Sequence, residues 1–257
     1  MKTIRIIPRL DIKGPNLVKG IHLEGLRVLG NPSDFARYYY ENGADELLYM
    51  DVVASLYERN SLKEVIKKTA KEIFIPLTVG GGLRTIEDIR EVLQAGADKV
   101  SLNTAAIRNP KIIEEAAKTF GSSTIVVTIE AIKQKDGKYL AYIDNGREYT
   151  GVEVIKWAKE VENLGAGEIL ITSVDREGTG LGFDVELVKS ITQIVDIPVI
   201  AHGGANSEED ILKVIIIGQC DAVAISSVLH YETIKHINSQ ADSKEGNTEF
   251  LKHNTIF

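Results

Sequence analysis

The sequence predicts an α/β protein whose chain forms one (β/α)8 barrel over residues 1–257. Three observations lead to this fold class. A length of 257 residues is usual for one such barrel. Short β-prone runs alternate with amphipathic helical stretches, and similar segments recur roughly 120 residues apart, which is typical of internal duplication. An open doubly wound sheet is the alternative, but eight strand–helix units of this size favour closure into a TIM barrel.

The expected elements follow one another as strand–helix units. Strands are expected where short runs are rich in β-branched residues, and helices where apolar residues recur at helical spacing. The units are 4–10 with 33–42, 46–50 with 62–71, 76–79 with 86–95, 99–102 with 111–119, 124–129 with 152–164, 168–172 with 185–192, 198–201 with 208–217, and 222–225 with 232–236.

The repeat divides the chain into two half-barrels, about 1–121 and 122–237, followed by a C-terminal tail at 238–257. Each half opens with a strand that ends in an acid, Asp11 in the first half and Glu130 in the second. Each half also has a diglycine turn after its third strand. Within the tail, the polar stretch 238–248 predicts a loose surface segment before a short last helix.

Two connections are longer than a barrel needs, 12–32 after the first strand and 131–150 after the fifth. The first contains Gly14-Pro15 and Gly25, and it is either a loop that folds over a ligand or a disordered connection. In the second, the turn residues 135–138 precede the β-prone run 139–143, which predicts a hairpin.

Composition and charge exclude several classes of function. The formal charge of −7 gives no general attraction to nucleic acid or to anionic membranes, so we expect neither as a partner. No apolar run is long enough to cross a bilayer, and the N-terminal stretch does not resemble a signal peptide. The single cysteine, Cys220, cannot form an internal disulfide. These features predict a cytoplasmic protein.

Glycine turns and polar side chains at the carboxyl ends of the strands predict two phosphate sites. Glycine amides at a helix start can approach an anion closely, and the active site of a parallel barrel lies at this face. A single glycine pair is more often a tight bend, so the prediction of a bis-phosphate substrate rests on the duplication. The sites comprise Gly81, Gly82, Asn103 and Thr104 in the first half, and Gly203, Gly204, Ser226 and Ser227 in the second.

Asp11 and Glu130 end opposite strands and should face each other across the barrel mouth, where one could donate and the other accept a proton. We therefore expect them to be the catalytic pair. The alternative is that each caps a loop or pairs with a nearby lysine, such as Lys19.

Asp51 and Asp175 follow equivalent strands and are weaker candidates for orienting a substrate hydroxyl or a loop. Asp175 opens the segment 175–179, which includes Gly178 and Thr179 and could instead be a plain charged turn. The five histidines are scattered, and no nucleotide-binding loop or serine-nucleophile motif is present. We therefore expect no metal and no other cofactor.

Nine groups of residues together carry a resemblance to a known family that extends over nearly the whole chain. They are 5–8 with 10–11, 18–20, 45–47, 51 with 54–55, 79–82, 97–101 with 103–105, 165–170, 175–176 with 178–179, and 203–204. With these motifs the chain resembles the cyclase subunit of imidazole glycerol phosphate synthase, from histidine biosynthesis. The resemblance implies that Asp11 and Glu130 are the acid–base pair and that Lys19, Asp51, Asp175, Gly178 and Thr179 belong to the substrate site.

The same resemblance implies a heterodimer with a glutaminase subunit that supplies ammonia. The substrate would be an aminoimidazole-carboxamide ribonucleotide with a ribulosyl arm, and the products imidazole glycerol phosphate and the aminoimidazole-carboxamide ribotide. Ammonia would enter from the opposite face through a gate of charges at Arg5, Glu46, Lys99 and Glu168. A plain paired or solvated barrel bottom is the alternative for these four residues.

Three residues depart from the family pattern. Glu130 replaces an aspartate, and a shift of about 1 Å in a catalytic group can cost on the order of a hundredfold in rate. Arg9 stands where the family has a small or thiol side chain, and strand alternation places it inside the barrel with Asp11. We expect Arg9 to pair with Asp11 or Glu130 and to lower that acid's pKa. His202 replaces a small residue and could contact a phosphate or simply pack.

These departures keep other functions open. A paralogue could use the same ammonia to make an amidino group on a surface-polysaccharide sugar, or the barrel could activate a glutaminase and conduct ammonia without catalysing a reaction. An isomerase acting on the preceding histidine intermediate fits less well, because the Arg5, Glu46, Lys99 and Glu168 set belongs to the cyclase pattern.

Overall fold

The computed structural model describes residues 3–54 and 62–237, and its strands and helices alternate along the chain. The barrel strands are β1 (Arg5–Lys13), β4 (Leu47–Asp51), β5 (Leu77–Gly80), β6 (Lys99–Leu102), β7 (Ile125–Lys133), β10 (Glu168–Ser173), β11 (Val199–His202) and β12 (Ala222–Ile225). The remaining strands are β2 (Asn16–Ile21), β3 (Glu24–Gly30), β8 (Tyr139–Ile143) and β9 (Glu148–Glu153). The helices are α1 (Pro32–Glu41), α3 (Lys63–Thr69), α4 (Ile86–Ala95), α5 (Thr104–Arg108), α6 (Lys111–Phe120), α7 (Val154–Asn163), α8 (Val185–Thr192), α9 (Glu208–Gly218) and α10 (Ser227–Ile234), with a short 3-10 turn, η1 (Ser122–Thr124).

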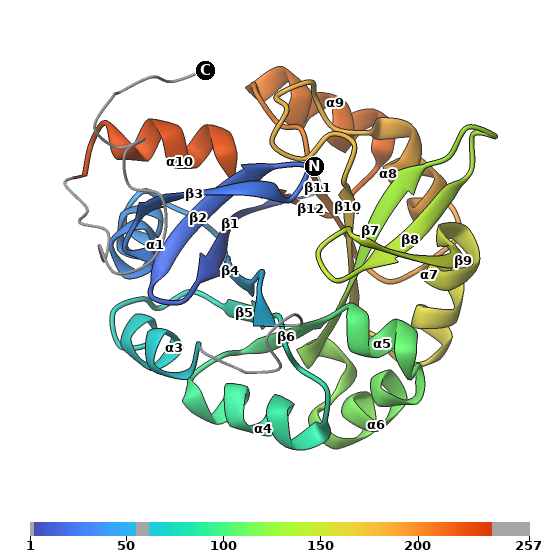
Figure 1. Ribbon diagram of the computed structural model, residues 1–257, viewed down its shortest axis with the longest axis horizontal. Helices are drawn as coiled ribbons and strands as arrows, with labels where there is room; N and C mark the ends of the chain where they lie inside the picture. The colour runs from blue at the N-terminus through green and yellow to red at the C-terminus, as the bar shows by residue number, and fades with distance from the viewer. Residues whose placement is uncertain (1–2, 55–61, 238–257) are drawn as a thin grey trace.

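The parallel strands close into a barrel. They pair in the order β10, β11, β12, β1, β4, β5, β6, β7, and β7 pairs again with β10. In Figure 1 the helices surround this ring of strands. The prediction of a (β/α)8 barrel is confirmed. Among the described residues, no helix has the length and apolar character needed to cross a membrane.

Alternate residues of β1 point into the barrel and mark its layers. Arg5 lies in a cluster of charges, Ile7 in an apolar layer, and Arg9 and Asp11 in a polar network. This confirms the alternation expected from sequence. The middle layer consists of Ile7, Leu48, Val126, Leu170, Ile200, Ala222 and Ala224.

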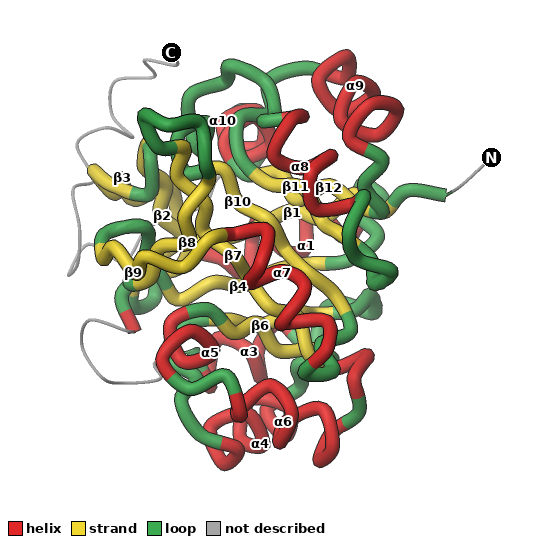
Figure 2. The backbone as a smooth tube through the Cα atoms, turned by 90° about the vertical axis from the view of Figure 1, so that its right-hand side faces the viewer, coloured by secondary structure: helices red, strands yellow, loops and turns green. Residues whose placement is uncertain are grey.

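The first strand of each half is longer than predicted because a hairpin extends it. β1 and β7 each run on as far as a lysine, and their last residues pair antiparallel with β2 and β8. Asp11 lies opposite Val18 in the first pairing, and Glu130 lies opposite Tyr142 in the second. In the side view of Figure 2 the strands β2, β3, β8 and β9 gather at one end of the barrel.

Some of the expected elements differ in the structure. The segment 12–32 is an ordered hairpin of β2 and β3, so its interpretation as a disordered connection is wrong. The predicted turn at 135–138 is confirmed and joins β7 to β8. Strand β9, which pairs with β8, was not expected, because none of its residues is buried and they lack alternation. Helix α10 begins at Ser227 rather than at residue 232, directly after β12, as α5 does after β6. The tail 238–257 lies outside the described residues.

Equivalent helices of the two halves begin with the same capping motif. The Thr85 side chain accepts a hydrogen bond from the Asp88 amide at the start of α4, and the Asp88 carboxylate accepts one from the Thr85 amide. Ser207 and Asp210 repeat this box at α9. Each box lies three residues beyond its diglycine turn. These matched ends support the duplication inferred from sequence.

The capping box at α9 predicts a stability effect. Ser207→Ala removes the acceptor of the Asp210 amide, so we expect the free energy of unfolding to fall by about 1 kcal/mol. Urea unfolding followed by circular dichroism measures this change. Ser190→Ala, inside α8, is the matched control because its hydroxyl only contacts a carbonyl of its own helix. Equal losses in both variants would contradict a capping role for Ser207.

Candidate active site

Asp11 is buried at the barrel mouth between two cations. Its Oδ1 accepts a hydrogen bond from Arg9 Nε at 2.9 Å, and its Oδ2 lies 3.4 Å from Lys19 Nζ. Burial alone would raise the pKa of Asp11, but the charges of Arg9 and Lys19 outweigh it and hold that pKa below its usual value. The expectation that Arg9 pairs with an acid and lowers its pKa is confirmed, and Asp11 is the anionic member of the pair.

Glu130 occupies the equivalent position in the second half with different neighbours. Its Oε2 accepts one hydrogen bond, from the Gly146 amide at 2.8 Å. Burial raises the pKa of Glu130 to about 7, although Arg9 and the Gly146 amide oppose the rise. The two acids therefore differ in protonation near neutral pH, because Asp11 is ionised while Glu130 is about half protonated.

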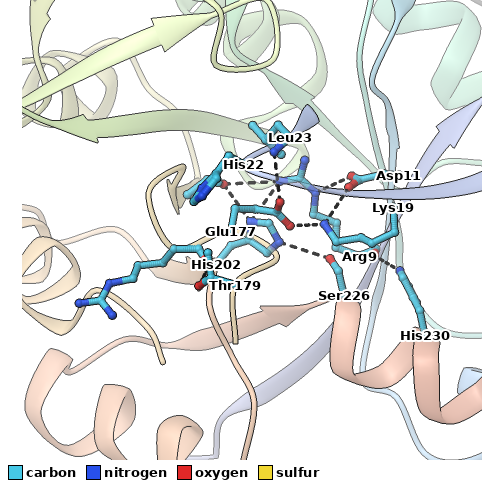
Figure 3. A network of polar contacts seen from close by, with 12 residues as sticks. Arg9, Asp11, Lys19, His22, Leu23, Glu177, Thr179, His202, Ser226 and His230 are labelled. Carbon is cyan, nitrogen blue, oxygen red and sulfur yellow. Dashed lines mark hydrogen bonds and ion pairs between the residues drawn. The ribbon is translucent and has the colours of Figure 1, made fainter. Parts of the chain in front are cut away.

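Arg9 connects the two halves across the barrel interior (Figure 3). Its side chain is 0% exposed, and its Nη1 lies 3.2 Å from His202 Nδ1 and 3.5 Å from Thr172 Oγ1. His202 Nε2 lies 3.3 Å from Ser226 Oγ. Arg9 Nη2 is buried and has no hydrogen-bond partner among the described residues. The guanidinium thus joins an acid of the first half to polar side chains of the second.

Glu177 completes the charged cluster and was not among the expected site residues. It is buried and forms an ion pair with Lys19, while its Oε2 accepts a hydrogen bond from the Leu23 amide at 3.3 Å. The His22 amide donates to the Glu177 carbonyl at 2.9 Å. The sequence showed a charged turn at 175–179 but not which of its acids points inward.

The hairpin tips meet over the mouth. The side-chain amide of Asn145 donates to the Leu23 carbonyl at 2.8 Å, and His22 Nδ1 lies 2.8 Å from the Val174 carbonyl. The β2–β3 hairpin therefore extends over the mouth to the second half, and its own residue Lys19 is buried there. The segment expected to fold over a ligand thus lies at the barrel mouth, and its closure over a ligand stays a prediction.

One cavity, of about 220 Å³, lies at the mouth on the side of the first half. It is lined by the first diglycine turn and by Glu130. Ser101 and Thr128, joined by a hydrogen bond of 2.5 Å between their hydroxyls, also line it, as do the cations Arg84 and Arg108. Of these four residues, sequence reasoning singled out only Ser101, as a donor beside the first glycine turn. Six expected site residues line this pocket: Asp51, Gly81, Gly82, Asn103, Thr104 and Glu130.

A second cavity, of about 400 Å³, lies on the side of the second half. It is lined by the second diglycine turn, by His202, and by Glu177, Tyr231 and Lys235, of which the last three were not expected. The N-cap residues of the two pockets, Asn103 and Ser226, have matching backbone angles of φ −129°, ψ −83° and φ −123°, ψ −86°. Six expected residues line this pocket: Gly178, Thr179, Gly203, Gly204, Ser226 and Ser227.

The diglycine turns require glycine. Gly81 has φ +97°, and a Cβ there would lie 2.2 Å from the Asp51 carbonyl oxygen. Gly204 has φ +98°, and its Cβ would lie 2.2 Å from the Gly182 carbonyl oxygen. Backbone conformation and close packing thus explain why glycine stands at both positions. The backbone amides of these turns line the pockets as a result.

Three expected site residues lie outside both pockets. Asp11 and Lys19 lie in the buried network described above. Asp175 accepts a hydrogen bond from the Lys133 amide at 2.8 Å and lines a separate surface hollow. The structure does not bring Asp175 together with the other site residues.

The four gate candidates form a ring at the opposite end of the strands. Arg5 contacts Glu46 at 2.9 Å and Glu168 at 3.1 Å. Lys99 contacts the same two acids at 3.1 Å and 3.3 Å. The apolar layer around Ile7 lies between this ring and the network of Arg9. Among residues 3–54 and 62–237, no group of three or more His, Cys, Asp or Glu side chains is arranged to hold a metal ion.

Comparisons with known proteins agree with this geometry. The family model described as "Histidine biosynthesis protein" matches residues 5–235. An imidazole glycerol phosphate synthase subunit HisF from Legionella pneumophila is 56% identical over 210 residues, which cover 82% of this chain and 99% of that protein. The protein of the same name from Alkaliphilus metalliredigens is 48% identical and covers 91% of this chain and 93% of its own length. The one from Methanocaldococcus jannaschii is 46% identical, with 92% and 95% covered.

The raised pKa of Glu130 predicts how stability depends on pH. Its pKa is about 7 in the folded chain against an ordinary 4.5, so folding loses free energy as pH rises between these values. Glu130→Gln, which mimics the protonated acid, should gain about 3 kcal/mol relative to the parent between pH 4.5 and pH 8. Urea unfolding at both pH values measures this gain.

The exposed variant Glu115→Gln provides the control for that measurement. Its difference from the parent should stay nearly constant over the same pH range. If the free energy of unfolding of Glu130→Gln also differed from that of the parent by a constant amount, the carboxyl of Glu130 would ionise in the folded chain as it does in the unfolded chain, contrary to the effect of its burial.

Proposed function

We propose that this chain, which belongs to the histidine biosynthesis protein family, is the cyclase subunit of imidazole glycerol phosphate synthase. In this function it uses ammonia to convert the ribulosyl aminoimidazole-carboxamide ribonucleotide into imidazole glycerol phosphate and the aminoimidazole-carboxamide ribotide. The observation that carries the proposal is a pair of buried acids, Asp11 held by Arg9 and Lys19 and Glu130 held by the Gly146 amide, at a mouth with two glycine-lined pockets.

The two pockets suit a substrate with a phosphate at each end. In each pocket a diglycine turn precedes a helix, and the residue that caps the next helix supplies a further polar group. Arg84 and Arg108 line the first pocket and Lys235 lines the second. Arg108 is paired with Asp144 and Glu148, and Lys235 with Glu232, so a phosphate would compete with these acids for both cations. A bis-phosphate with one phosphate in each pocket would span the mouth and lie near the two acids.

The acids have distinct roles in this proposal. Glu130, with a pKa of about 7, carries a proton that it can donate at neutral pH and lines the first pocket, where it can reach substrate. Asp11 is ionised and can accept a proton from the substrate, or from the nitrogen of ammonia once that nitrogen has formed its bond to the substrate. Arg9 and Lys19 fix the orientation of its carboxylate.

The face with the ring of Arg5, Glu46, Lys99 and Glu168 is where we place the glutaminase partner. The relatives are named as subunits, and a partner docked there would deliver ammonia at the far end of the barrel interior. The ring is closed by ion pairs, so a neutral molecule such as ammonia would enter when these pairs shift. The proposal places this heterodimer in the cytoplasm, in agreement with the composition.

The purified chain should convert the ribulosyl ribonucleotide when ammonium salt is supplied at alkaline pH. Loss of substrate absorbance measures the turnover. Asp11→Asn should reduce it by a factor of at least about 100, because removal of a general acid or base typically costs 10² to 10⁴-fold. Full activity in Asp11→Asn, or binding without turnover in the parent, would contradict the cyclase assignment.

One observation favours a second candidate function. The guanidinium of Arg9 is fully buried on the barrel axis, between the charged ring and the catalytic acids. It narrows the interior through which ammonia would pass. A paralogue that uses ammonia to amidate another substrate, such as a surface-polysaccharide sugar, or a barrel that only conducts ammonia, would also be compatible with this residue.

The double substitution Arg9→Cys with Glu130→Asp separates these candidates. If the parent is a slow cyclase because of these two residues, the double variant should turn over the ribulosyl substrate on the order of ten to a hundred times faster, since both changes restore the family pattern. The same absorbance assay applies, with circular dichroism to confirm folding. An unchanged rate would favour a different substrate for this barrel.

A further inference from the structure

His202 is a buried link between Arg9 and the second pocket. Its Nδ1 lies 3.2 Å from Arg9 Nη1, and its Nε2 lies 3.3 Å from Ser226 Oγ. Only 3% of His202 is exposed. Figure 3 shows the imidazole between the network around Asp11 and the start of α10 at Ser226. The family resemblance assigns no role to this residue, because the family has a small side chain there.

Two groups contact His202 Nδ1, Arg9 Nη1 and Thr172 Oγ1, each at 3.2 Å. A hydroxyl can donate or accept, but a guanidinium has only donors, so the contact with Arg9 requires that Nδ1 accept. Nδ1 therefore carries no proton. Burial, followed by the charge of Arg9, lowers the pKa of His202 well below its usual value, so the ring is neutral and its one proton lies on Nε2.

The direction of the next hydrogen bond follows from this tautomer. Nε2–H donates to Ser226 Oγ, which uses that oxygen as an acceptor. The hydroxyl proton of Ser226 is then free to point elsewhere, and within the described part of the chain His202 is its only side-chain contact. Ser226 lines the second pocket beside Gly203 and Gly204.

We propose that His202 is a positioning residue that holds the Ser226 hydroxyl as a hydrogen-bond donor to a phosphate group in the second pocket. Arg9 fixes the direction of both hydrogen bonds, because it donates the first of them to His202. This proposal rests on the proposed function only in that the second pocket accepts a phosphate. The proposal also connects proton transfer with phosphate binding, since one guanidinium orients the Asp11 carboxylate and, through His202, the Ser226 hydroxyl.

The tautomer can be measured directly. Long-range ¹H–¹⁵N correlation spectra of the ¹⁵N-labelled protein at neutral pH distinguish rings protonated at Nδ1, at Nε2 or at both nitrogens. The signal of His202 is the one absent from the spectrum of His202→Gln. We expect the Nε2–H form. A ring protonated at Nδ1, alone or together with Nε2, would overturn the proposal.

Binding of inorganic phosphate tests the effect on the pocket. Amide shifts of Gly204 and Gly82 report the second and first pockets separately in one titration. His202→Met removes the ring donor and should weaken phosphate binding at Gly204 about tenfold, the loss typical of one charge-assisted hydrogen bond. Binding at Gly82 should stay unchanged, which provides an internal control against general loss of structure.

Two further variants make the test specific. His202→Gln can place a donor N–H where Nε2 lies, so it should retain most of the phosphate affinity that His202→Met loses. Ser226→Ala should weaken binding as His202→Met does, and the double variant should be no weaker than either. Undiminished binding at Gly204 in His202→Met would refute the role of His202 while leaving the pocket intact. Absence of phosphate binding at both glycines would contradict the proposed function instead, and the tautomer would still be measured.

Discussion

The burial of Arg9 is the constraint on which the organisation of the barrel mouth depends. A guanidinium that is fully removed from water is costly unless its donors and its charge are matched. Here Asp11 supplies the opposite charge, and Thr172 and His202 lie within reach of Nη1. These partners come from three strands and both halves of the chain. Removing Asp11 would leave a buried charge without its counterion, and removing Thr172 or His202 would take an acceptor from Nη1. These contacts hold the two halves in one arrangement at this level of the barrel.

The same balance of charge explains why the two catalytic acids differ. Arg9 and Lys19 are balanced by Asp11 and Glu177, so the buried cluster is neutral before Glu130 is considered. An ionised Glu130 would add a negative charge that no cation contacts among residues 3–54 and 62–237; its hydrogen bond comes from the Gly146 amide. Its position is equivalent to that of Asp11, but Thr128 stands two residues before it where Arg9 stands before Asp11. In a duplicated scaffold the two acids thus differ in pKa, because Arg9 and Lys19 offset the burial of Asp11 while burial dominates at Glu130.

Much of this arrangement was predictable from sequence, because it depends on periodicity. The barrel, the facing acids, the two glycine turns and the inward alternation of Arg5, Arg9 and Asp11 all follow from repeats of two residues, of one strand–helix unit or of half the chain. What sequence did not reveal depends on contacts between distant loops. Glu177 and Asp175 are two residues apart in one charged turn, and only the hairpin that covers Lys19 decides that Glu177 points inward. Arg84, Arg108 and Lys235 lie on helix starts and ends that ordinary surface charges also occupy.

The hairpin over the mouth is held by the same charges, and this links closure to the site. His22 and Leu23 at its tip have φ of +53° and +63°, in the left-handed region that costs side chains with a Cβ roughly 1–3 kcal/mol each. Contacts with Val174, Glu177 and Asn145 hold the tip in this conformation. Glu177 also lines the second pocket and pairs with Lys19 of the hairpin itself. The second pocket and the hairpin therefore share one side chain, because Glu177 lines the pocket and also holds the hairpin through Lys19 and the Leu23 amide.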